Sequence, residues 1–132
     1  MDFFKIDGIK YDVLVTSIEE NFSILYSENT GRTMARGARM VLDPLGTFFG
    51  HKVTVQRKKG FEQAFDELYD YISRPRADGL TVDIVHNQTT ISYEAYISQG
   101  NRKLKRIDEK TGKVYWDELS LNIVPLEAQV LP

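Results

Sequence analysis

Hydrophobic and polar residues alternate along most of the chain. In residues 9–15 every second position is apolar or aromatic, and after a polar break at residues 17–21 the alternation resumes over residues 22–26. A period of two is typical of a β-strand with one buried face. We therefore predict that residues 9–15 and 22–26 are two strands of an antiparallel hairpin.

The next segment, residues 27–50, is interrupted by several glycines and by the Asp43-Pro44 pair. Such residues favour turns, so we predict a long loop with one strand near residues 38–42. Long loops in small domains are often functional, and an irregular strand pair is the alternative interpretation. Val53 and Val55 then indicate a further strand that runs into a basic stretch.

One segment has the period of a helix. Its apolar residues are spaced three and four apart, and acidic residues occupy the opposite face. Gly60 precedes this segment, and Pro75 disfavours a helical residue before it. We predict one amphipathic α-helix at about residues 61–74, covering one side of a sheet.

Strand character returns after the helix. The predicted elements are a turn at residues 77–79, a hairpin of residues 80–84 and 91–97 joined at residues 87–88, an edge-type strand at residues 101–107, a turn at residues 108–112 and a long strand at residues 114–124. The order of strands, helix and strands predicts a mostly β (α+β) protein.

Composition narrows the possible classes of function. The 132 residues are enough for a single domain, residues 1–132, with 42% hydrophobic and 27% charged residues. Lys and Arg number 17 and Asp and Glu 19, a net charge of −2 that gives no general attraction to nucleic acid or anionic lipid. The sequence has no cysteine, no signal-peptide pattern and no apolar run long enough to span a membrane. We expect a protein of the cytoplasm in which it is made, without a membrane partner.

No catalytic motif is present in the sequence. His51 and His86 lie outside any spacing that brings two imidazoles onto one metal ion, and neither a nucleophile elbow nor a phosphate-binding glycine loop occurs. The acidic residues of the predicted helix are typical of a solvated helix face. The prediction is a protein that is not an enzyme and has no catalytic residues, metal site or cofactor.

A basic cluster near the end of the chain is a candidate binding surface. It contains Arg102, Lys103, Lys105 and Arg106. On a strand these charges alternate between the two faces, so they do not all meet one row of phosphates. Charged residues also protect an edge strand from unwanted pairing. Edge protection and a weak contact with nucleic acid both remain open.

Three stretches resemble a known group of proteins. The first is residues 3–13, where Gly8 leads into a G-x-x-Y-x-V strand, and the second is residues 31–49, with a G-R-T segment and a later L-G-T-F-F turn. The third is the aromatic-rich close at residues 115–125. Together they resemble the small tail-module structural proteins of siphophages and prophages of Gram-positive bacteria. The resemblance implies an antiparallel β-sandwich or partly closed barrel with one flanking helix, as in tail-tube proteins.

The resemblance also implies a function. It predicts a non-enzymatic virion protein that self-associates into a ring, docks to other phage tail proteins, and moves from the host cytoplasm into the virion tail. The expected assembly residues are Arg32, Arg36, Arg39, Asp43, Phe48 and Phe49, with plain solvent exposure as the alternative for the arginines. One alternative function is a monomeric prophage accessory module that binds protein or nucleic acid through the basic strand. Another is a small-ligand barrel lined by Val13, Val15, Ile91 and Tyr93.

Overall fold

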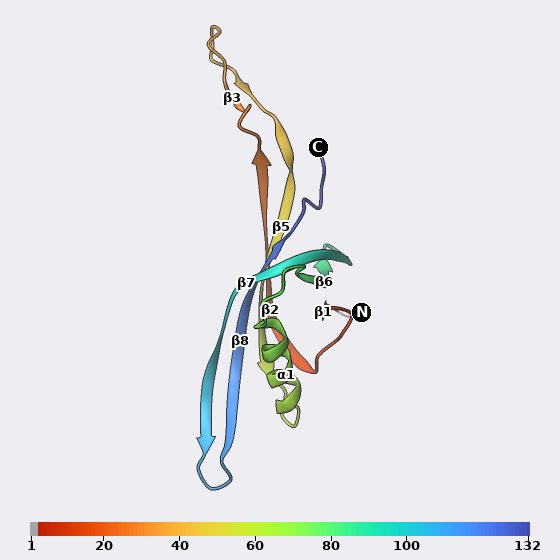
Figure 1. The fold of residues 1–132 in the computed structure, drawn as a ribbon, viewed down its shortest axis with the longest axis vertical. Helices are drawn as coiled ribbons and strands as arrows, with labels where there is room; N and C mark the ends of the chain where they lie inside the picture. Colours follow the sequence, from red (N-terminus) through yellow and green to blue (C-terminus); the bar gives the residue numbers. More distant parts are fainter. Residues whose placement is uncertain (1–2) are drawn as a thin grey trace.

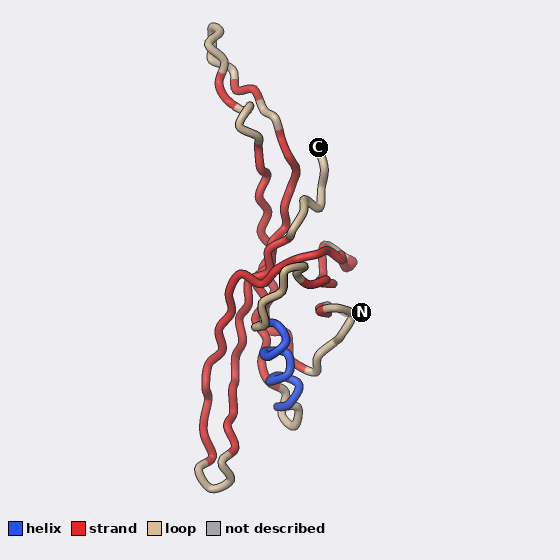
Figure 2. The backbone as a smooth tube through the Cα atoms, viewed as in Figure 1, coloured by secondary structure: helices blue, strands red, loops and turns tan. Residues whose placement is uncertain are grey.

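Strands make up most of the structure. The computed structural model describes residues 3–132 (Figures 1 and 2). Its elements are β1 (Phe4–Ile6), β2 (Val13–Tyr26), β3 (Gly31–Arg32), β4 (Met40–Val41), β5 (Pro44–Arg57), α1 (Glu62–Ile72), β6 (Leu80–His86), β7 (Thr89–Asp108) and β8 (Lys113–Pro125). The predicted mostly β fold with one flanking helix is confirmed.

Six strands form one antiparallel sheet in the order β1-β6-β7-β8-β5-β2. A bulge between Ile97 and Gln99 marks the point where β7 bends, so that β1, β6 and the first part of β7 lie across the long strands (Figure 1). The sheet folds over on itself in the manner of a sandwich and is not closed into a barrel. The suggested ligand barrel therefore lacks an enclosed interior, and Val15, one of its suggested lining residues, is exposed.

The hydrophobic core lies between the bent sheet and α1. Phe65, Leu68 and Ile72, spaced three and four apart, form the buried stripe of the helix. Their neighbours in the core come from β1, β2, β5, β6, β7 and β8: Phe4, Ile6, Val13, Val53, Val55, Leu80, Val82, Ile84, Ala95, Leu119, Leu121 and Ile123. α1 lies within the predicted range.

Two hairpins project from opposite ends of this core (Figure 2). β2 and β5 form one, and β7 and β8 form the other. The predicted hairpin of residues 9–15 and 22–26 is wrong, because β2 continues without interruption through the polar residues 17–21. A strand at the edge of a sheet, with much of its surface in water, accommodates polar residues on both faces.

The predicted long loop is shorter than expected. Residues 44–50 belong to β5, and residues 27–43 form the tip of the β2–β5 hairpin, which contains the small β3–β4 pair. The irregular strand pair is the interpretation closer to the structure. The predicted hairpin turn at residues 87–88 and the turn at residues 108–112 are confirmed, and the edge-type strand at residues 101–107 is the second half of β7.

The sheet has two chemically different faces. Along β5, buried His51, Val53 and Val55 alternate with residues whose side chains lie on the other side of the strand. That other face is polar across four strands. One row of paired residues on it consists of Ser17, Thr54, Ser120 and Asn101, and the next consists of Glu19, Lys52, Asn122 and Gln99. We call this surface the polar face.

Candidate functional site

The predicted assembly residues fall into two places. Arg32, Arg36 and Arg39 lie in the tip of the β2–β5 hairpin, where Arg32 Nη1 donates to the Ala38 carbonyl oxygen at 3.3 Å. Arg36 and Arg39 are exposed and make no side-chain hydrogen bond or ion pair with any residue in the described range 3–132. The tip therefore presents two free guanidinium groups to solvent.

Asp43 closes the base of this tip. Its carboxylate accepts a hydrogen bond from the Ser27 hydroxyl, and its backbone N–H donates to Thr30 Oγ1 at 2.8 Å. Phe48 and Phe49 lie further along β5 on opposite faces of the strand, since they are adjacent in sequence. The six predicted residues thus do not converge on one site.

Two arginines of the basic strand contact other side chains of the same chain. The Arg102 guanidinium lies between the rings of Tyr69 and Trp116, 3.8 Å and 4.0 Å from their centroids, and Nη1 pairs with Asp66 Oδ1 at 3.2 Å. Arg106 lies 4.4 Å from the centroid of the Tyr115 ring. Arg102 therefore holds α1 against the β7–β8 hairpin through cation–π contacts.

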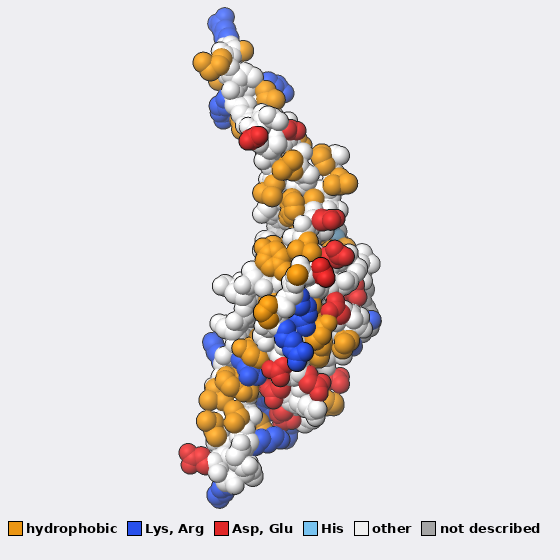
Figure 3. Space-filling model, viewed as in Figure 1, with side chains coloured by type: hydrophobic (Ala, Val, Ile, Leu, Met, Phe, Trp, Pro, Cys, Tyr) orange, Lys and Arg blue, Asp and Glu red, His pale blue; other side chains and the backbone are white. Residues whose placement is uncertain are grey.

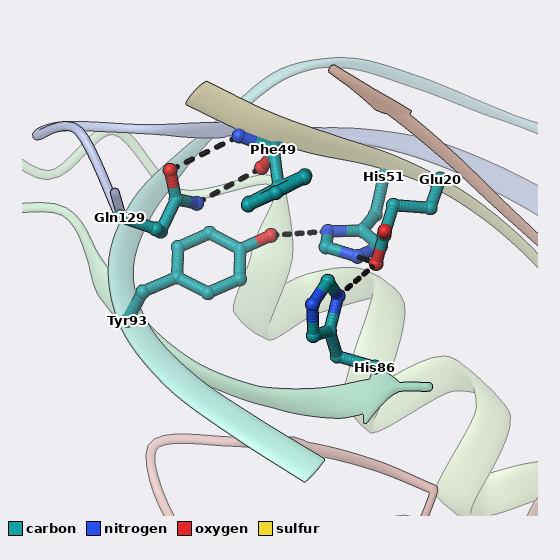
Figure 4. Close-up of polar contacts among 6 residues, drawn as sticks. All are labelled: Glu20, Phe49, His51, His86, Tyr93 and Gln129. Carbon is teal, nitrogen blue, oxygen red and sulfur yellow. Dashed lines mark hydrogen bonds and ion pairs between the residues drawn. The ribbon is translucent and has the colours of Figure 1, made fainter. Parts of the chain in front are cut away.

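The structure contains a polar cluster that was not predicted from the sequence. His51 on β5 is buried, with Nε2 3.0 Å from Glu20 Oε2 and Nδ1 2.6 Å from the Tyr93 hydroxyl (Figure 4). His86 on β6 places Nδ1 2.8 Å from the same Glu20 oxygen. A carboxylate only accepts, so both histidines donate to Glu20, and neutral His51 accepts from the Tyr93 hydroxyl. The cluster joins β2 and β5 to β6 and β7.

Protonation in this cluster follows from burial and from the shared hydrogen bonds. Burial lowers the pKa of His51, although the Glu20 carboxylate opposes that shift. Burial would raise the pKa of Glu20, but hydrogen bonds from His86 and His51 outweigh it and leave the pKa below its ordinary value. Burial also raises the pKa of Tyr93. Near neutral pH the cluster holds neutral His51, neutral Tyr93 and an ionised Glu20.

The chain's last segment lies on the upper part of β5, next to this cluster. The Gln129 side-chain amide donates to the Phe49 carbonyl and accepts from the Phe49 N–H, both at 3.0 Å (Figure 4). Thr47 and Val130 form an isolated bridge beside it. A Cβ on Gly46, whose φ is +149°, would come within 2.6 Å of the Ala128 Cβ, so the close approach requires glycine.

A cavity of about 640 Å³ lies between this segment and the β6–β7 hairpin. Its lining residues are Phe49, His86, Ile91, Ser92, Tyr93, Glu94, Glu127, Ala128, Gln129 and Val130. The rings of Phe49 and His86 are 5.0 Å apart at their centroids. Two carboxylates and three aromatic side chains give the cavity the chemistry of a cation-binding surface. We call it the acidic aromatic cavity.

Metal-ligand groups and long apolar helices are both absent from residues 3–132. No group of three or more His, Asp or Glu side chains in residues 3–132 has the arrangement of a metal site. No helix in the same range is long and apolar enough to cross a bilayer. No protein-family model matches the sequence, and no curated protein matches it significantly.

Proposed function

We propose that this chain is a structural protein that self-associates through the edges of its sheet, as a tail-tube-like component of a phage or prophage virion. The observation that carries the proposal is the pair of long strand edges at either side of the β7-β8-β5-β2 unit. Within residues 3–132, β2 pairs only with β5, and β7 pairs with β6 no further than Ala95. Unpaired N–H and C=O groups along such edges are templates for another strand.

The directions of the strands favour joining one copy to the next. Each strand in the β7-β8-β5-β2 unit is antiparallel to its neighbour. Because the unit has four strands, its two outer strands run in opposite directions. β2 of one copy therefore meets β7 of the next copy as an antiparallel pair, and repetition of this head-to-tail contact gives a ring when the rotation between copies closes.

The two edges also lie at the same level along the strands. The row Ser17, Thr54, Ser120 and Asn101 crosses all four strands, so Ser17 on one edge is level with Asn101 on the other. In the described part of the chain β7 is unpaired on its outer side at this level, because β6 pairs with it only as far as Ala95. The part of β2 around Ser17 thus faces a free stretch of β7 in the next copy.

The two faces of the sheet supply an inside and an outside for such a ring. The polar face carries mostly hydroxyl and amide side chains, and the opposite face is covered by α1 and the core. A ring closed through its sheet edges would place the polar face around a water-filled channel and α1 on the exterior. The alternative function through the basic strand has less support, since Arg102 already contacts Tyr69, Trp116 and Asp66.

Disulfide cross-linking tests this edge contact directly, because the chain contains no cysteine. In one copy, Ser17 and Asn101 are separated by three strand spacings, about 14 Å, which is too far for a disulfide. We expect the Ser17→Cys/Asn101→Cys variant to form a ladder of cross-linked oligomers on oxidation. The variants Ser17→Cys/Gln99→Cys and Ser17→Cys/Lys103→Cys extend the scan one step each way along the same face of β7.

Ser23→Cys/Asn101→Cys is the matched control, because Ser23 is an exposed serine on the same face of β2, above the level at which β7 is free. This variant should form little ladder. Light scattering across a wide concentration range and electron microscopy then show whether the wild-type protein forms rings or tubes. A monomer at every concentration, with no ladder in any variant, would overturn the proposal.

A further inference from the structure

The tip of the β2–β5 hairpin has the composition of a binding element, and Arg36 and Arg39 in it have no side-chain partner among residues 3–132. Residues 29–42 contain three arginines and no acidic residue. Met34 is fully exposed, and Met40, Val41 and Leu42 are also exposed. Arg and Met are enriched in protein interfaces, and exposed apolar groups beside unpaired arginines are typical of a contact surface.

The acidic aromatic cavity is the chemical complement of this tip. Glu94 and Glu127 carry its negative charge, and Phe49, His86 and Tyr93 supply ring faces and edges. A guanidinium group that lies over an aromatic ring and pairs with a carboxylate uses both features at once. The cavity volume, about 640 Å³, is in the range that accommodates groups of several side chains.

The tip and the cavity of one copy do not meet. The hairpin carries its tip away from the body, while the cavity lies where the C-terminal segment joins the body (Figure 1). The space-filling view shows Lys and Arg side chains at the far end of the hairpin, whereas around the middle of the molecule Asp and Glu side chains lie among Lys and Arg side chains (Figure 3). The complement within reach of the tip therefore belongs to another molecule.

We propose that the hairpin tip of one copy docks into the acidic aromatic cavity of a second copy, with Arg36 and Arg39 facing Glu94 and Glu127. This inference rests on the proposed self-association and adds a second contact to it. The edge contact between β2 and β7 joins copies side by side. The contact between tip and cavity joins two different surfaces, so it is a second heterologous contact between copies.

A second disulfide pair tests this contact independently of the sheet edges. Met34 is fully exposed in the tip, and Ser92 is exposed at the cavity. We expect the Met34→Cys/Ser92→Cys variant to form intermolecular disulfides. Lys110→Cys/Ser92→Cys is the matched control, because Lys110 lies in the exposed turn of the other hairpin. The control should cross-link about tenfold less, since a random encounter lacks the docking free energy.

Charge reversal supplies the specificity test. In the Met34→Cys/Ser92→Cys background, Arg36→Glu/Arg39→Glu should lower the cross-linking yield about tenfold, since two cation–carboxylate contacts are lost. Glu94→Lys/Glu127→Lys should lower it to a similar extent. Two single-cysteine proteins are then mixed: Met34→Cys with Arg36→Glu/Arg39→Glu, and Ser92→Cys with Glu94→Lys/Glu127→Lys. Because the reversed charges again attract, this mixture should restore the yield.

The outcomes separate this inference from the edge contact. If the Ser17→Cys/Asn101→Cys ladder persists while charge reversal leaves the Met34→Cys/Ser92→Cys yield unchanged, the tip contact is overturned and the proposed function stands. Cross-linking of tip to cavity without any edge ladder would overturn the edge contact instead. If the charge-reversed mixture fails to recover the yield, the tip contact is overturned and the cavity is left to a small cationic ligand.

Discussion

His51 Nε2 and Glu20 Oε2 lie 3.0 Å apart, and this contact joins a fully buried imidazole to a carboxylate on the outermost strand of the sheet. Because the same oxygen also accepts from His86, one carboxylate ties β2 to β5 and to β6. The hairpin that carries the tip is thereby attached to the body through a group whose protonation depends on pH. Its stability should therefore vary with pH.

The direction of that dependence follows from two pKa shifts. The pKa of His51 lies below its ordinary value of 6.5 because of burial, so the unfolded chain binds a proton that the folded chain does not. The stabilising contribution of neutral His51 is therefore fully present above pH 6.5 and is lost as the pH falls toward the lowered pKa. The lowered pKa of Glu20 adds a further loss below pH 4.5. Both shifts make the folded protein sensitive to acid.

We expect the free energy of unfolding, measured by urea denaturation, to decrease between pH 7.5 and pH 5.0. In His51→Gln this slope should be much smaller, and stability at pH 7.5 should fall by about 1–3 kcal/mol because Glu20 and Tyr93 lose a buried partner. His86→Gln is the control that keeps the buried imidazole and should retain most of the slope. An equal slope in wild type and His51→Gln would contradict this assignment.

Arg102 should contribute to stability rather than only to surface charge. Its guanidinium is stacked between Tyr69 and Trp116, so Arg102→Ala is expected to cost about 1–3 kcal/mol in urea denaturation, mainly from two cation–π contacts. Arg102→Lys keeps the charge but loses the planar stacking, and should recover less than half of the loss. Lys105→Ala, on the same strand, should change stability by less than about 0.5 kcal/mol. Equal effects of Arg102→Ala and Lys105→Ala would refute this role.

The exposed apolar residues on β2 should contribute little to folding stability. Phe22 is 67% exposed, whereas Phe65 is fully buried. Phe22→Ser is therefore expected to leave the melting temperature within about 2 °C of wild type. Phe65→Ala should cost about 3–5 kcal/mol of folding stability. A large loss of stability in Phe22→Ser would place this residue in the core instead.

The helix was predictable because its apolar stripe has a period that no strand shares, and because Gly60 and Pro75 bound it. The strands after it were predictable from alternation and turn residues. The continuity of β2 was not, since the polar residues 17–21 resemble a turn when only local sequence is considered. Their position at the edge of the sheet, which a local pattern does not contain, allows them to stay in a strand.

The polar cluster was beyond the reach of sequence patterns for a related reason. Glu20, His51, His86 and Tyr93 are up to 73 positions apart and have no characteristic spacing. The pairing of β2 with β5 and the folding of β6 and β7 across them bring the four side chains together. One signal was available: His51 falls in register with Val53 and Val55, on the face of β5 that the alternation predicts to be buried.

Gln129 takes the place of a neighbouring strand for Phe49. Its amide satisfies both the N–H and the C=O of that residue, so Gln129→Ala should leave both groups without their partner and cost about 1–2 kcal/mol. Gln129→Glu retains an acceptor for the N–H but not a donor for the carbonyl, and should show an intermediate loss. The measurement is amide hydrogen exchange at Phe49 together with urea denaturation.

The expected order of Phe49 exchange rates is wild type slowest, then Gln129→Glu, then Gln129→Ala. The Val53 amide lies in the part of β5 that pairs with both β2 and β8, and its exchange should change much less in either variant. This difference would show that the C-terminal segment protects the upper part of β5 locally. Uniform acceleration at Phe49 and Val53 would instead mean that the segment stabilises the whole domain.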